Sequence, residues 1–61
     1  MSYEVLKAEY VFQTLAKGDK VIACDFATMT MKNCEDLTVK QINSYIEKGT
    51  AVVFYKAVSN E

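Results

Sequence analysis

The chain uses one short phrase twice: an apolar-periodic segment that ends in Lys-Gly and is followed by an apolar run. The first copy has Lys17-Gly18 before residues 21–24, and the second has Lys48-Gly49 before residues 51–55. A cation in the last turn and a glycine just after it are typical of a helix end, and each following run is rich in strand-forming residues. The phrase therefore predicts helix followed by strand, twice, and it accounts for both glycines of the chain.

The chain is short and rich in apolar residues. Its 61 residues, 51% of them hydrophobic, predict a single domain over 1–61, and a domain of this size buries only about 60% of the surface that its unfolded form exposes. Small domains usually gain stability from disulfides, a metal or a partner chain. Because the chain has two cysteines and no histidine, we expect that source to be another copy of the chain.

The charges exclude several classes of partner. All seven basic residues are lysine, and eight acidic residues bring the net charge to −1. Nucleic-acid recognition normally uses arginine and a basic patch, so we expect no nucleic-acid partner, and the acidic residues are too few for a DNA mimic. No apolar stretch is long enough to span a bilayer, and no basic segment leads into an apolar one at the N-terminus. We expect a soluble, cytoplasmic protein without a membrane partner.

Residues 3–17 allow two interpretations. On a helix at about 100° per residue, with Ser2 as N-cap, one apolar stripe faces the core, formed by Val5, Ala8, Val11, Phe12, Leu15 and Ala16. The alternative is a strand over residues 4–14 that pairs with the next run through a turn at residues 17–19, which gives the order β-β-α-β. The periodicity favours the helix.

The second helix has the most specific local signal. Thr38 and Gln41 fit a capping box, in which each side chain bonds to the backbone amide of the other residue. Leu37 and Ile42 stand where a hydrophobic staple needs them. These residues predict a helix that begins at Val39 and ends at the second Lys-Gly.

The remaining runs predict strands. Residues 21–26 and 28–31 form either one long strand or a two-strand meander. In the last strand, residues 50–58, Ala51, Val53 and Tyr55 point one way, and Val52 and Phe54 point the other way with Val58. Neither face of that strand is polar.

Together these elements predict a small two-layer α+β domain with the order α-β-(β)-α-β. Two short helices cover one face of a two- or three-stranded, mainly antiparallel sheet. The chain has no further element for the other face, so we expect a second copy to cover it in a homodimer or larger assembly. We predict the interface at an outward apolar stripe and at one face of the last strand, that is, at Tyr3, Leu6, Tyr10, Val52 and Phe54.

The residue types that usually carry chemistry do not form a recognisable site. Cys24 and Cys34 are not spaced as a C-x-x-C motif, and two thiols without a histidine cannot complete a zinc site. Cys24 is interpreted as a small buried hydrophobe and Cys34 as part of a polar turn, with a redox role for the pair as a weaker hypothesis. Asp25 is interpreted as the end of a strand or as facing water, although burial would raise its pKa. We expect no metal, no cofactor and no catalytic residues.

The surplus apolar surface favours a non-enzymatic interaction module that acts as a homo-oligomer on another protein, as an inhibitor or regulator does. In general appearance, a short acidic chain with two helix-glycine-strand units is similar to small proteins of phages and mobile elements. The alternative hypothesis is a small-molecule binder with a pocket between subunits, where Tyr45 or Tyr55 stacks on a planar ligand and lysines meet an anionic group.

Overall fold

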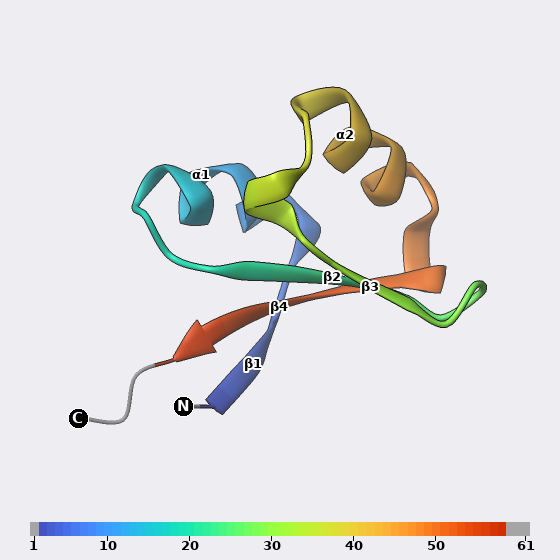
Figure 1. Ribbon diagram of the computed structural model, residues 1–61, viewed down its shortest axis with the longest axis horizontal. Helices are drawn as coiled ribbons and strands as arrows, with labels where there is room; N and C mark the ends of the chain where they lie inside the picture. The colour runs from blue at the N-terminus through green and yellow to red at the C-terminus, as the bar shows by residue number, and fades with distance from the viewer. Residues whose placement is uncertain (1, 59–61) are drawn as a thin grey trace.

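The computed structural model describes residues 2–58 as a four-stranded antiparallel sheet with two short helices on one side (Figure 1). The elements follow in the order β1 (Ser2–Leu6), α1 (Val11–Ala16), β2 (Val21–Asp25), β3 (Thr30–Asn33), α2 (Val39–Glu47) and β4 (Val52–Val58). Short 3-10 turns occupy Ala8–Tyr10, Cys34–Asp36 and Gly49–Ala51. The predicted small two-layer α+β domain is confirmed, but its sheet has four strands rather than two or three.

The strands lie in the order β1-β4-β2-β3, and every neighbouring pair is antiparallel. Each helix therefore joins two strands that run in the same direction with one strand between them. The α1 connection passes over β4, and the α2 connection passes over β2. Both connections lie on the same face of the sheet, which leaves the opposite face without a covering element in residues 2–58 (Figure 1).

The N-terminal segment differs from the predicted helix over residues 3–17. Its first part is strand β1, which pairs with β4 along five positions from Ser2↔Val58 to Leu6↔Phe54. The helix begins only at Val11, after the 3-10 turn, so Ser2 is not an N-cap. The strand alternative over 4–14 is also wrong, because the strand stops at Leu6 and pairs with β4 instead of β2. The backbone pairing with the distant strand β4 decides the conformation of this segment. The helical period of its apolar residues carries no information about that pairing.

Helix α2 confirms its predicted capping box. The amide of Gln41 donates to Thr38 Oγ1 at 3.2 Å, and the amide of Thr38 donates to Gln41 Oε1 at 2.9 Å. Both glycines lie just beyond helix ends with positive φ, at 88° for Gly18 and 65° for Gly49. That left-handed conformation favours glycine and ends each helix as the Lys-Gly phrase predicts.

Strands β2 and β3 form a hairpin, which confirms the meander over the single long strand. The turn occupies residues 26–29, and Met29 has a φ of 55°. The second strand consequently begins at Thr30 and not at Thr28.

The core lies between the helices and the sheet. Val11 of α1 and Ile42 of α2 pack with the sheet residues in a cluster completed by Val21, Ala23, Cys34, Val52 and Phe54. Val52 and Phe54 are only 5% and 3% exposed. The expectation that they form an uncovered face is therefore wrong: the helices cover the side of β4 that carries Phe54, and the side that carries Val53 and Tyr55 is open.

The longest helix, α2, has nine residues, and within residues 2–58 no helix has the length and apolar character needed to cross a bilayer.

Candidate functional site: the uncovered face of the sheet

The face of the sheet opposite the helices is almost entirely apolar. Strand alternation and the pairing register place nine side chains on it. They come from all four strands and none is charged: Tyr3, Val5, Ile22, Cys24, Met31, Asn33, Val53, Tyr55 and Ala57. We call this surface the open face.

The distribution of charge between the two sides of the sheet is the reverse of the usual one. An antiparallel sheet with one solvated side normally has polar residues there and apolar residues toward the core. Here the strand residues on the helix side include Glu4, Asp25, Lys32 and Lys56, whereas the open face has none. A surface with this composition is costly to leave in water and favourable to cover.

The outer strands contribute the most exposed residues of the open face. Val5 on β1 is 68% exposed, Met31 on β3 is 67% exposed and Tyr3 is 52% exposed. Side chains on the central strands β2 and β4 are partly or largely buried by their neighbours, as at Ile22, Val53 and Tyr55. The open face is therefore continuous across the sheet, with its accessible apolar area greatest at the two edges.

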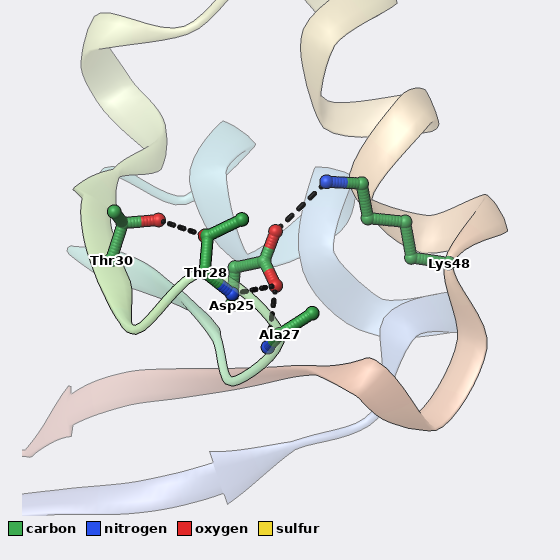
Figure 2. A network of polar contacts seen from close by, with 5 residues as sticks. All are labelled: Asp25, Ala27, Thr28, Thr30 and Lys48. Carbon is green, nitrogen blue, oxygen red and sulfur yellow. Dashed lines mark hydrogen bonds and ion pairs between the residues drawn. The ribbon is translucent and has the colours of Figure 1, made fainter.

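The most strongly bonded polar group in the described chain is the carboxylate of Asp25, at the end of β2 (Figure 2). Its Oδ1 accepts hydrogen bonds from the amides of Ala27 at 3.0 Å and Thr28 at 3.4 Å. Its Oδ2 lies 2.8 Å from Nζ of Lys48, the residue that caps the C-terminal end of α2. Asp25 is only 3% exposed, so the prediction that it faces water is wrong, although it does end a strand.

The partners of Asp25 outweigh the effect of burial on the pKa of its carboxyl. The hydrogen bond from Lys48 and those from the two backbone amides hold the pKa of the Asp25 carboxyl below its ordinary value, although burial opposes them. The same contact raises the pKa of the Lys48 ammonium. Both groups are therefore charged at neutral pH, and the pair joins the β2–β3 turn to the end of α2.

The two cysteines lie on opposite sides of the sheet. Cys24 is on the open face and 8% exposed, which agrees with its interpretation as a small buried hydrophobe. Cys34 belongs to the core and is 1% exposed, so the prediction of a polar turn is wrong for its side chain. Burial raises the pKa of the Cys34 thiol to about 11 and also raises that of Cys24. Both thiols are free, and neither is activated as a nucleophile.

The predicted interface residues are divided between different parts of the structure. Tyr3 lies on the open face, and Tyr10 is 44% exposed in the 3-10 turn before α1. The other three line one apolar hollow of about 360 Å³ at the end of α2, on the helix side: Leu6, Val52 and Phe54. Only Tyr3 of the five therefore belongs to the open face, and the sequence prediction missed Val5, Ile22, Met31, Val53 and Tyr55 as its neighbours.

The two tyrosines predicted to bind a ligand do not meet within one chain. Tyr45 is on α2 and packs partly against the core, whereas Tyr55 is on the open face. Within residues 2–58 no group of three or more histidine, cysteine or acidic side chains has an arrangement that could hold a metal ion.

No protein-family model, curated protein or solved structure gives a significant match to the chain, so the case for a function comes from its own geometry.

Proposed function

We propose that the protein is a non-enzymatic interaction module that pairs with a second copy of itself through the open face. The observation that carries this proposal is the reversed charge distribution: the side of the sheet without a cover has no charged residue, and the covered side has four. A face of this kind gains free energy when water is removed from it.

A second copy suits the open face better than a charged partner does. The face offers no charge for electrostatic complementarity, and a net charge of −1 gives little repulsion between two copies. Two sheets can pack face to face about 10 Å apart with their side chains interdigitated. In a two-fold arrangement each copy covers the same surface of the other, which supplies the missing layer to both.

The size of the face sets the expected affinity. Four strands spaced about 4.8 Å apart, each of about five residues, cover roughly 20 Å by 17 Å. This footprint, roughly 340 Å² per copy, is less than half of the about 800 Å² per partner that a standard specific interface buries, so we expect a weak dimer with a dissociation constant in the micromolar range rather than an obligate one.

Two exposed positions on the open face and one on the helix layer provide a matched test. Val5→Lys and Met31→Lys each place a charge on the open face. Both positions are on edge strands, where lysine is well tolerated. Val39→Lys changes a residue of similar exposure, 65%, at the start of α2. In sedimentation velocity we expect the first two variants to weaken association at least tenfold and Val39→Lys to associate as the wild type does.

Circular dichroism of each variant shows whether the fold is retained. The proposal fails if the wild-type chain sediments as a monomer at several hundred micromolar. It also fails if Val39→Lys disrupts association as much as the two open-face variants do, because that result places the interface on the helix layer.

That the module also binds another protein, as an inhibitor or regulator, stays a prediction. In the alternative, a ligand pocket between subunits, the positions of the two tyrosines decide which of them could contact the ligand. A face-to-face dimer brings Tyr55 of each copy into the interface but leaves Tyr45 outside it.

A further inference from the structure

A small cavity, open to solvent, lies on the helix side of the sheet between α2 and the edge strand β3. Its volume is about 270 Å³. Five of its lining residues lie on α2 or next to one of its ends, and one comes from β3: Leu37, Gln41, Ser44, Tyr45, Lys48 and Lys32. The cavity is close to the lower limit of ligand pockets, about 300 Å³, so an occupant must be small.

The lining of the cavity is positively charged. Among the residues that the structure describes, no carboxylate lines it, and it has two lysines. Lys48 is neutralised by Asp25 at 2.8 Å, and its ammonium group lies 5.1 Å from the centre of the Tyr45 ring. Lys32 makes no ion pair or hydrogen bond with its side chain within residues 2–58. One uncompensated positive charge therefore remains, and it comes from Lys32.

The other polar groups are already oriented by hydrogen bonds in the cap and the body of α2. Gln41 Oε1 accepts the bond from the Thr38 amide, so the NH₂ group of Gln41 is left to donate. Ser44 donates its hydroxyl to the Lys40 carbonyl at 3.1 Å and keeps its oxygen lone pairs free to accept. Leu37 and the Tyr45 ring add apolar surface. The cavity thus combines a cation from β3 with an amide donor and an aromatic wall from α2.

We propose that this cavity binds a small aromatic carboxylate. The carboxylate of the ligand pairs with the Lys32 ammonium and accepts from the Gln41 amide, while its ring packs between Leu37 and Tyr45. The proposal does not depend on the dimer, because the cavity and the open face are on opposite sides of the sheet.

The test is a titration of the ¹⁵N-labelled full chain with benzoate, followed by amide chemical shifts in NMR spectra. Benzyl alcohol serves as the neutral analogue and inorganic phosphate as the anion without a ring. Lys32→Gln removes the proposed cation, and Lys17→Gln removes an equal charge from the end of α1, outside the cavity. The same spectra report whether each variant is folded.

We expect benzoate to shift the amides of β3 and α2 and to bind at least fivefold more tightly than either analogue. Lys32→Gln should weaken benzoate at least fivefold, and Lys17→Gln should leave it unchanged. The proposal is overturned if benzoate causes no saturable shift up to about 10 mM. It is equally overturned if either analogue binds as well as benzoate, or if the two lysine variants behave alike.

Discussion

At the scale of single residues, Asp25 shows how a buried charge is accommodated in a small domain. Three donors surround its carboxylate, two from the turn that follows it and one from Lys48, more than twenty positions further along the chain (Figure 2). With fewer partners, burial of the carboxylate would raise its pKa or destabilise the fold. The same contacts fix the β2–β3 turn against the end of α2, so one residue orients two loops.

The lowered pKa of Asp25 predicts how stability depends on pH. The ionised carboxylate stabilises the folded state above the pKa that it has in the unfolded chain, about 4, and this contribution is lost as the pH falls through the lower folded value. Asp25→Asn should therefore be less stable than the wild type at pH 7, and it should lose less stability between pH 7 and pH 3. Urea unfolding at the two pH values measures both differences.

Asp19→Asn is the control, because the side chain of Asp19 has no hydrogen bond or ion pair within residues 2–58. It should follow the wild type at both pH values. Equal losses for Asp25→Asn and the wild type would mean that the Asp25–Lys48 contact does not stabilise the fold.

Burial of Cys34 predicts an unreactive thiol. With a pKa of about 11, only about one thiol in a thousand is ionised at pH 8, and only the thiolate reacts with iodoacetamide. In Cys24→Ser, where Cys34 is the only thiol, we expect labelling at least a hundredfold slower than that of free cysteine. Mass spectrometry follows the modification, and urea should restore the normal rate. Rapid labelling of the folded variant would contradict the burial of Cys34.

At the scale of elements, helix α2 depends on its cap. Thr38→Ala removes the acceptor for the Gln41 amide and should lower the free energy of unfolding by about 1 kcal/mol. Thr38→Ser keeps a hydroxyl in the same place and should retain most of that stability. Urea unfolding compares the variants, and equal stability of the alanine and serine forms would show that the capping box contributes nothing.

Elements with local signals could be predicted from sequence, and elements set by distant contacts could not. The capping box at Thr38 and Gln41, and the Lys-Gly ends at Gly18 and Gly49, are local and were correct. Strand β1 depends on β4, about fifty residues away, and its residues fit a helical period equally well. Alternation alone therefore could not separate strand from helix there.

At the scale of the whole molecule, the difference between local signals and distant contacts explains why the interface was predicted on the covered side of the last strand. Alternation in the last strand correctly separated Val52 and Phe54 from Val53 and Tyr55. Which of these two sets is covered depends on the side to which both helices cross, and that is a property of the whole fold. The two apolar faces of the last strand led us to expect a second covering layer, but they could not show which side of the sheet lacks a cover.

The open face is also what connects fold to proposed function. The two helices complete one side of the sheet, and the core beneath them buries seven hydrophobic residues. This is a small core for an independent domain. A partner on the other side would bury Ile22, Val53 and Tyr55 fully and place Cys24 within the interface, which adds a second apolar layer to each copy.

The most direct test of the proposed pairing is an isotope-filtered NOE experiment on a mixture of ¹³C-labelled and unlabelled chains at about 1 mM, where a micromolar dimer is almost fully formed. It detects only contacts between different copies. The account predicts intermolecular contacts from the methyl groups of Val5, Ile22, Met31 and Val53 to the rings of Tyr3 and Tyr55. Intermolecular contacts confined to α1 or α2, or none at all at that concentration, would contradict it.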